Sequence, residues 1–373
     1  MKHRKQIPGA NYSLCLAAVV FSFSAIVAAD SPTNLPLWFE ENVGHEVPQV
    51  QYAFRGQTGG LVMTEEGLYI RLHNNATTQM RFNQMGLFSW EGLNLYQGKA
   101  HHFKGTGSTK NIPLYASVRQ TNIFPGVDLV VHGRQRTLEY DFVVHPGANP
   151  SEIRFSFDNA EKLTLDEYGN LVVRLQNETF LCKAPVAYQE NLTDKKIVSC
   201  RYFLDANGFV SFRLGDYDQT LPLTIDPVIV FSSSFQLPTG TLYGVGVDAQ
   251  GNVYIGGFTA MPAVLTENES EAELHGDLDI FAVKLNSELT EVLYVTYIGG
   301  SLHDDIKAMA VDGSGIAYLG GRTKSPDFPT TENAFCRTHK ATFDNVIIKL
   351  SPTGDEMIYS TLLGGESMEE IRG

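Results

Sequence analysis

Short runs in which apolar and polar residues alternate recur along most of this chain, and they predict β-strands. Residues 171–175 and 209–214 place apolar side chains at every second position, as a strand with one buried face requires. Asp205-Ala-Asn-Gly208 separates two such runs, at a place where Asn and Gly accept positive φ. Helical periodicity is nearly absent, so the pattern indicates an all-β protein. Further expected strands are 68–72, 129–132, 138–144 and 153–157.

The last third of the chain repeats itself in blocks of strand-like sequence. A fixed order of blocks at one period is typical of repeat architectures, in which each unit buries its faces against its neighbours. Two blocks return 65 positions later and one returns 64 positions later: 279–286 as 344–351, 293–300 as 358–365, and 247–254 as 311–318.

One repeat unit holds four strand candidates, and four antiparallel strands fit a β-propeller blade. A solenoid is the alternative, but its coils usually have shorter repeats. Residues 260–277 and 324–343 supply the excess length as loops between the first and second strands. The strand candidates of the first unit are 252–258, 280–285, 292–298 and 306–311.

The first residues have the pattern of an export signal. Lys2, Arg4 and Lys5 precede an apolar run that ends with Val27 and Ala29, the small residues that a signal peptidase requires. An uncleaved membrane anchor is the alternative, but the run is about 16 residues, short of the roughly 20 that span a bilayer. We therefore expect cleavage after Ala29, and no later stretch is apolar enough to span a membrane.

Charge and cysteine content narrow the class of protein. The net charge is −14, and loss of the three cations of residues 1–29 takes it to −17, so the acidic surface disfavours nucleic acid as a partner. Cys182 and Cys200 flank an expected hairpin. An exported protein can keep a disulfide there, so we predict that bond. Cys336 would then stay free or pair between chains.

The chain divides at Asp226-Pro227, because proline restricts the residue before it and cannot join a central strand ladder. After the signal peptide of residues 1–29, residues 30–226 form the expected N-terminal sandwich or barrel-like domain. Residues 227–373 supply about two four-stranded blades and a stub, an incomplete propeller truncated at its C-terminus. We expect these blades to form an open arc with an unprotected strand edge near Leu363.

The repeat motifs carry a family resemblance. Lys-Leu-Asn, Leu-Tyr-x-Thr-Tyr-x-Gly-Gly and Val-Asp-x-x-Gly-Asn-x-Tyr resemble the SBBP repeat of bacterial secreted β-propeller proteins. The upstream region resembles the domain of unknown function that commonly precedes those repeats. The resemblance implies secretion or surface display, a propeller, and no catalytic residues. Ile316 departs from the pattern, because Asn is expected after Gly315. The upstream stretches that match are 37–44, 124–129, 138–148, 185–189 and 221–227.

Several acidic and histidine residues are candidates for cation binding. Asp304 and Asp305 follow the Gly-Gly turn of one unit and are weak metal candidates, with a solvated acidic loop as the favoured alternative. Asp248 and Asp312 open loops that could take Ca²⁺, but each loop offers one carboxylate and a tight turn explains it better. The adjacent pair His101-His102 would point apart on a strand, so we assign it no site. Glu139 and Asp141 would share one face of a strand, where a solvent-facing edge explains them better than a catalytic pair.

The sequence favours a binding protein over an enzyme. It has no Gly-x-Ser-x-Gly elbow, His-Glu-x-x-His helix or phosphate loop. We expect an exported cell-surface or extracellular interaction module in the cell envelope, with a protein or carbohydrate ligand and no cofactor unless Ca²⁺ binds. The alternative is a secreted hydrolase or lyase that uses the propeller as its scaffold. The ligand and the total number of blades are left open by the sequence.

Overall fold

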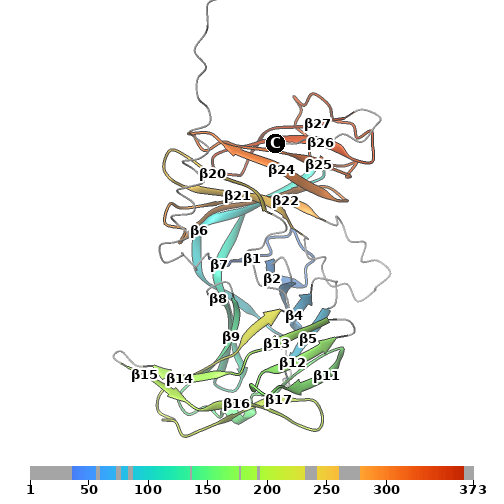
Figure 1. Ribbon diagram of the computed structural model, residues 1–373. Coiled ribbons are helices and arrows are strands. Elements are labelled where there is room, and N and C mark those ends of the chain that lie inside the picture. Colours follow the sequence, from blue (N-terminus) through green and yellow to red (C-terminus); the bar gives the residue numbers. More distant parts are fainter. Residues whose placement is uncertain are drawn as a thin grey trace, which may run out of the picture.

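The computed structural model describes residues 36–55, 59–72, 77–82, 87–134, 137–175, 178–190, 194–231, 242–259 and 278–364. Strands make up nearly all of the regular structure, and the described part contains one short 3-10 helix, η1 (Pro150–Glu152) (Figure 1). The predicted all-β class is confirmed. The expected cleavage site at Ala29 and the expected loop 260–277 lie outside the described residues.

The N-terminal domain is a nearly closed, barrel-like sheet. Its strands pair in the order β16–β17–β10–β5–β4–β3–β2–β1–β7–β8–β9. The strands of this domain are β1 (Phe39–Glu41), β2 (Val50–Arg55), β3 (Gly59–Thr64), β4 (Gly67–Leu72), β5 (Thr77–Phe82), β6 (Trp90–Lys104), β7 (Gly107–Phe124), β8 (Val127–Arg134), β9 (Thr137–Val144), β10 (Phe155–Phe157), β11 (Ala160–Leu165), β12 (Leu171–Leu175), β13 (Glu178–Cys182), β14 (Val186–Glu190), β15 (Lys195–Val198), β16 (Cys200–Leu204), β17 (Val210–Leu214), β18 (Leu223–Asp226) and β19 (Val228–Phe231).

Alternation along β9 shows how the sequence pattern builds the core of this domain. Leu138, Tyr140, Phe142 and Val144 are all buried, because successive side chains of a strand point to opposite faces. The Phe142 ring centroid lies 5.8 Å from that of Phe155 and makes further aromatic contacts in the barrel interior.

The sheet forks at β9, and Pro227 is the point of the fork. β18 pairs with the second half of β9 and leads to β14 and β15, whereas β19 pairs with its first half and leads to β13, β12 and β11. Pro227 has no backbone N–H and cannot donate a hydrogen bond to a neighbouring strand. Its carbonyl accepts a hydrogen bond from the Tyr140 N–H at 3.2 Å. The strand that follows the expected domain boundary therefore still pairs within the N-terminal domain.

The repeat region forms two four-stranded antiparallel sheets. The first sheet contains β20 (Leu242–Val247), β21 (Val253–Thr259), β22 (Asp279–Leu285) and β23 (Val292–Gly299). The second sheet contains β24 (Asp304–Val311), β25 (Ala317–Thr323), β26 (Asp344–Leu350) and β27 (Met357–Leu363). The strand expected to close the first unit, residues 306–311, instead opens the second sheet as β24.

The two sheets pack face to face. A Cβ atom on Gly244 of the first sheet would lie 2.3 Å from the Cβ of Met309 in the second, so this contact requires glycine. Their shared core contains Tyr254, Ile280 and Ile298 of the first sheet and Ile306, Leu319 and Ile348 of the second.

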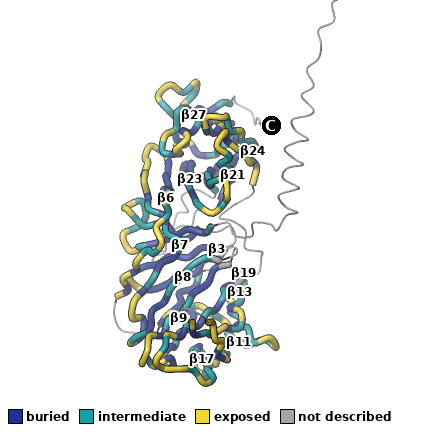
Figure 2. Tube along the Cα trace, turned by 90° about the vertical axis from the view of Figure 1, so that its left-hand side faces the viewer, coloured by how far each residue is buried: buried dark blue, intermediate teal, exposed yellow. Residues whose placement is uncertain are grey.

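A long hairpin of the N-terminal domain joins the first sheet. The first half of β6 pairs with β7 inside the barrel, and its second half pairs in parallel with β23, from Lys99 opposite Tyr294 to Lys104 opposite Gly299. We call residues 99–113 the arm. Figures 1 and 2 show β6 and β7 running from the barrel to the repeat sheets. The arm thus adds two strands to the free side of β23.

The second sheet covers its own edge. The Thr331 N–H donates to the Ser360 carbonyl at 3.0 Å, and the Leu362 N–H donates to the Cys336 carbonyl at 3.0 Å. Residues 331–336, from the loop between β25 and β26, therefore occupy the outer side of β27. The expectation of an unprotected edge near Leu363 is wrong at this strand, because the long loop supplies the missing backbone partners.

Candidate functional site

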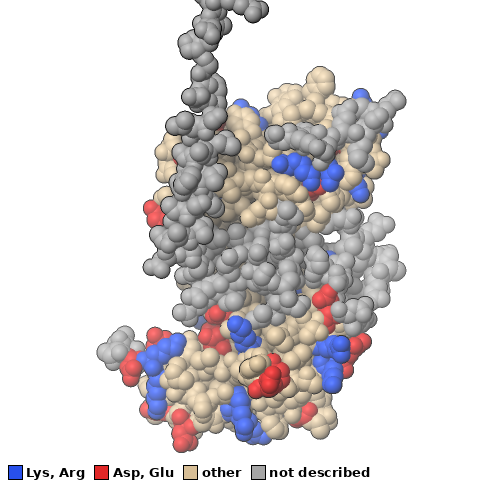
Figure 3. Space-filling view, viewed as in Figure 1, with Lys and Arg blue, Asp and Glu red and all other residues tan. Residues whose placement is uncertain are grey.

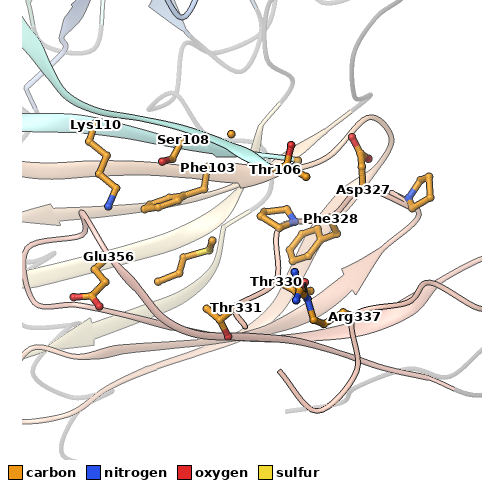
Figure 4. A pocket seen from close by; sticks show the side chains of 15 residues that line it. Phe103, Thr106, Ser108, Lys110, Asp327, Phe328, Thr330, Thr331, Arg337 and Glu356 are labelled. Carbon is orange, nitrogen blue, oxygen red and sulfur yellow. Dashed lines mark hydrogen bonds between the residues drawn. The ribbon is translucent and has the colours of Figure 1, made fainter. Parts of the chain in front are cut away.

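A pocket of about 480 Å³ lies between the tip of the arm and the loop that joins β25 to β26 (Figure 4). Its two walls come from segments more than 200 residues apart in the sequence, so only the folded chain creates it. The lining residues are Phe103, Gly105, Thr106, Gly107, Ser108, Lys110, Pro326, Asp327, Phe328, Pro329, Thr330, Thr331, Arg337, Glu356 and Met357.

Backbone contacts around the Gly299-Gly300 turn hold the two walls together. The Gly105 N–H donates to the Gly299 carbonyl at 3.1 Å, which fixes the tip of the arm at the end of β23. On the other wall, Oδ1 of Asp327 accepts hydrogen bonds from the N–H and the hydroxyl of Ser301, each at 2.8 Å. Asp327 therefore stabilises this wall through its hydrogen bonds to Ser301, and it also lines the pocket.

The lining offers charged groups of both signs together with hydroxyl groups. Figure 4 shows Lys110 and Glu356 at one end, and Asp327 and Arg337 at the other. Buried Phe103 contributes an apolar surface, and the Lys110 ammonium lies 5.5 Å from its ring centroid. Such a pocket can both donate hydrogen bonds to a polar ligand and accept them. Its remaining hydroxyl and aromatic groups are those of Thr106, Ser108, Phe328, Thr330 and Thr331.

Two buried carboxyl groups lie beside the same turn, outside the pocket lining. Oδ2 of Asp304 accepts hydrogen bonds from the Gly300 N–H at 2.7 Å and the Ser325 hydroxyl at 2.9 Å. Oδ2 of Asp279 lies 3.8 Å from Nζ of Lys104. Burial raises the pKa of Asp279 to about 7 and the pKa of Asp304 to about 6. Neither carboxyl group belongs to the lining of the pocket.

The structure separates the two acids that the sequence proposed for a metal. Asp304 and Asp305 are consecutive on β24, so their side chains point to opposite faces. Asp305 forms ion pairs with His303 at 3.0 Å, Lys307 at 3.3 Å and Arg322 at 3.1 Å. Burial acts to raise the pKa of Asp305, but these partners outweigh it and lower the pKa. The carboxylate is already neutralised by its own neighbours.

The loops proposed for Ca²⁺ are turns closed by their own aspartates. Oδ1 of Asp248 accepts hydrogen bonds from the N–H groups of Gln250 and Asn252, each at 3.0 Å. Asp312 does the same for Ser314 at 2.9 Å and Ile316 at 3.1 Å. These oxygens accept hydrogen bonds within the turns, in agreement with the turn that the sequence favours over a Ca²⁺ site.

The cysteines do not form the predicted bond in this structure. Cys182 lies on β13 between β12 and β19, and Cys200 begins β16, which pairs with β17. Both are free thiols. The two cysteines do flank one hairpin in the chain, formed by β14 and β15, but they lie on strands that pair with different neighbours.

At the junction of the arm and the barrel, three side chains form a cluster that no sequence pattern predicts. His101 and His102 do point apart: Nδ1 of His101 accepts a hydrogen bond from the Asn111 N–H, whereas Nε2 of His102 lies 2.9 Å from Oε2 of Glu40. The ring of His45 lies 4.7 Å from that of His102. We call Glu40, His45 and His102 the junction cluster. Glu40 and His45 are close in sequence, but no local pattern connects them with residue 102.

Arg55 balances the charge of this cluster. Its Nε lies 3.3 Å from Oε2 of Glu40, and its guanidinium also pairs with Glu46. Burial acts to raise the pKa of Glu40, but Arg55 and His102 hold it well below its usual value. Burial also lowers the pKa of His102. The cluster therefore contains an ionised carboxylate beside a neutral imidazole.

Comparison with known proteins assigns the N-terminal domain. No curated protein matches the chain. Among the described residues, no helix has the length and apolar character needed to cross a membrane. Residues 39–228, which include every strand of the barrel from β1 to the start of β19, match a family described as a domain of unknown function, DUF7948. This match covers more than half of the sequence, and the chain therefore belongs to the DUF7948 family.

Proposed function

We propose that this protein is an exported bacterial binding module, of the cell surface or the extracellular space, that holds a small carbohydrate in the pocket between the arm and the β25–β26 loop. The pocket is the observation that carries the proposal. Its volume of about 480 Å³ falls within the range of small-molecule sites, roughly 300–1,000 Å³. It combines aromatic surface with hydroxyl groups and charged groups of both signs.

The lining favours a sugar over an anionic polymer. Lys110 and Arg337 are balanced by Asp327 and Glu356 within the same pocket, so a polyanion would find no net positive charge there. Figure 3 likewise shows basic and acidic side chains interspersed on the visible face of the barrel. A sugar hydroxyl both donates and accepts hydrogen bonds, which suits a lining of hydroxyl, carboxylate and ammonium groups.

The positions of the acidic residues favour a protein that binds its ligand without converting it. A hydrolase or lyase needs carboxyl groups of suitable pKa in contact with its substrate. Among the residues that the structure describes, the carboxyl groups with raised pKa are those of Asp279 and Asp304, which are buried and do not line the pocket. Asp327 does line it, but Oδ1 of its carboxylate already holds Ser301.

We further propose that the two repeat sheets are consecutive propeller blades. Tyr254 and Tyr318 occupy equivalent repeat positions, as do Ala282 and Ile347. Tyr254 and Ala282 face the second sheet and are 0% exposed, whereas Tyr318 and Ile347 are each 37% exposed. The outer face of the second sheet thus presents the positions with which the first sheet packs on its neighbour, as a series of blades requires.

The binding proposal is tested by titrating the protein with a panel of neutral oligosaccharides, using calorimetry. We expect at least one oligosaccharide to bind and Glu356→Gln and Lys110→Met to weaken that binding at least tenfold, because each removes a polar contact. Lys162→Met is the matched control, since Lys162 is exposed on β11, in the barrel. Chromatography of the mixture tests the rival: cleavage of a bound oligosaccharide would establish a hydrolase or lyase. Failure of the whole panel to bind would reject the carbohydrate proposal.

The blade proposal has its own experiment. A chain carrying one more copy of residues 300–364 at its end should bury the outer face of the second sheet. Hydrogen exchange at the amides of β25 and β26 should then slow relative to the chain as it stands. Unchanged exchange would show that this face does not accept a further repeat.

A further inference from the structure

The junction cluster brings three metal-ligating side chains to one buried point. Glu40 comes from β1, His45 from the loop that follows β1, and His102 from the half of β6 that belongs to the arm. Each offers one ligand atom, and these atoms all lie within 4.8 Å of one another. The side chains of Glu40, His45 and His102 are 1%, 5% and 9% exposed.

Several polar atoms of this buried cluster have no hydrogen-bond partner among the described residues. They are both ring nitrogens of His45, Oε1 of Glu40 and the hydroxyl oxygen of Tyr297, whose ring lies 4.8 Å from the ring of His102. His45 comes within 3.9 Å of Oε2 of Glu40, which is too long for a hydrogen bond. Leaving a buried donor or acceptor unpaired is costly, so four such atoms at one point call for a partner.

We propose that Glu40, His45 and His102 bind a divalent transition-metal ion, for which zinc is the best fit, and that this ion fastens the arm to the barrel. Two imidazole nitrogens and one carboxylate oxygen are a ligand set for zinc, whereas calcium takes oxygen ligands alone. The hydroxyl of Tyr297 or a water molecule completes four-coordination.

The distances between the side chains agree with this assignment. Zinc bonds of 2.0–2.2 Å in a tetrahedron place the ligand atoms about 3.3 Å apart. The observed separations from Oε2 of Glu40 are 2.9 Å to Nε2 of His102 and 3.9 Å to Nε2 of His45. The three ligand atoms all lie within 4.8 Å of one another, so side-chain adjustments of about 1 Å bring them to the spacing of a tetrahedral zinc site.

The surrounding charges permit a divalent cation. Arg55 pairs with both Glu40 and Glu46, so its single positive charge faces two carboxylates and leaves negative charge for a divalent cation. The ion would connect β1 and its following loop to the arm, which carries two strands of the extended first sheet. Metal binding would therefore stabilise the junction between the N-terminal domain and the repeat region.

The experiment uses the full protein, stripped with EDTA and titrated with zinc chloride by calorimetry. Cobalt(II) serves as a second probe, because its visible absorption reports tetrahedral coordination. We expect one ion per chain and a higher melting temperature with zinc, as binding to the folded state requires. His45→Ala should lower zinc affinity by more than the roughly 10–100-fold typical of residues that only support a ligand.

Two comparisons keep the result interpretable. The ring of His45 packs on the ring of His102, 4.7 Å away, so His45→Ala and the wild type are each melted in EDTA and again with zinc, and the rise in melting temperature on adding zinc should be lost in His45→Ala. His145→Ala is the matched control, because His145 is 49% exposed and pairs with Asp128 away from the cluster. Absence of one-to-one zinc or cobalt binding by the wild type, or equal affinity in His45→Ala, would overturn the proposal.

Discussion

The two repeat sheets share their strand order and register but differ in what protects their edges. In the first sheet, β23 is followed by β6 of the arm in a parallel pairing. In the second, residues 331–336 of its own loop bond to β27. An open edge invites association with other chains, so both sheets need a cover. The repeated sequence specifies the four strands of each sheet, and segments outside these strands cover the edges of the two sheets.

The two sheets also differ in what covers the face that corresponds between them. The face of the first sheet that turns away from the second packs on Trp38, Ala100 and Leu114 of the N-terminal domain. The equivalent face of the second sheet packs on the first sheet, through residues such as Val346 and Ile348. The N-terminal domain thus occupies, for the first sheet, the place that a preceding repeat would fill. The N-terminal domain therefore caps the first sheet on the face that the second sheet does not cover.

The largest expected effect comes from removing that cap contact with Trp38→Ala. Trp38 is buried between the barrel and the first sheet, and truncation of a buried aromatic residue costs about 3–5 kcal/mol. We expect the free energy of unfolding, measured in urea, to fall by this amount.

Ile347→Ala is the matched comparison on the exposed face of the second sheet. Substitutions at exposed positions usually change stability by about 0.5 kcal/mol or less. Equal losses in the two variants would contradict the difference between a covered and an uncovered face.

The second prediction uses Asp279 and Asp344, which occupy equivalent repeat positions at the start of β22 and β26. Burial raises the pKa of Asp279 from 3.8 to about 7, so the folded chain holds this proton more tightly than the unfolded chain does. Its contribution to stability is full below pH 4 and is lost as the pH rises to about 7. Asp279→Asn should therefore stabilise the protein at pH 8, by at most about 4 kcal/mol at about 1.4 kcal/mol per pKa unit.

Urea unfolding at pH 4 and pH 8 measures this effect. The gain should be small at pH 4, where the wild-type carboxyl group is already largely neutral in the folded protein. Asp344→Asn is the control, because Oδ2 of Asp344 accepts a hydrogen bond from the Lys340 N–H at 2.7 Å. Asp344→Asn should not stabilise the protein, since it weakens that bond. A loss of stability in Asp279→Asn at pH 8 would contradict the prediction.

Local patterns predicted the strands of this fold far better than their long-range partners. The expected strand 280–285 is β22 (Asp279–Leu285) to within one residue, because alternation and turn residues are local signals. The pairing of Lys99 with Tyr294 joins residues almost 200 positions apart, and no sequence period marks it. The assignment of residues 306–311 to the first unit failed for a similar reason, since the repeat period does not say where one sheet ends.

The candidate sites show the same difference between local signals, which the sequence contains, and long-range contacts, which it does not reveal. Asp304 and Asp305 stand out in the sequence because they follow a Gly-Gly turn, but alternation along β24 places their side chains on opposite faces. His101 and His102 point apart, as the sequence predicts for neighbours on a strand, and this alternation gives His102 no local partner for a site. What could not be predicted was that Glu40 and His45 lie opposite His102, because the arm alone brings them together.

The third prediction concerns the place where the arm crosses onto the first sheet. A Cβ atom on Gly98 would lie 2.1 Å from the carbonyl oxygen of Val292, which is backbone and cannot move aside easily. Gly98→Ala should destabilise the protein by about 1–3 kcal/mol through this overlap. Limited proteolysis should also cleave the loosened arm faster than in the wild type.

Gly107→Ala is the matched control in the same hairpin. Its added Cβ atom would meet only the Lys104 carbonyl oxygen, at an ordinary 3.6 Å. We expect little change in stability or in cleavage. Equal sensitivity of the two variants would mean that arm docking does not depend on the close approach at Gly98.

The smallest effect separates two equivalent tyrosines. The hydroxyl of Tyr254 is buried and bonds both to Oδ2 of Asp248 and to the Gly315 carbonyl of the second sheet, each at 3.1 Å. The hydroxyl of Tyr318 is exposed and bonds to Oδ2 of Asp312 at 3.2 Å. Tyr254→Phe leaves the Gly315 carbonyl without this donor and should cost about 1 kcal/mol, whereas Tyr318→Phe should cost close to nothing, because water replaces its bond. Urea unfolding of both variants at pH 7 measures the difference. Equal costs would imply that the outer face of the second sheet is covered in solution, by another copy of the chain, and dilution should then bring the cost of Tyr318→Phe back toward zero.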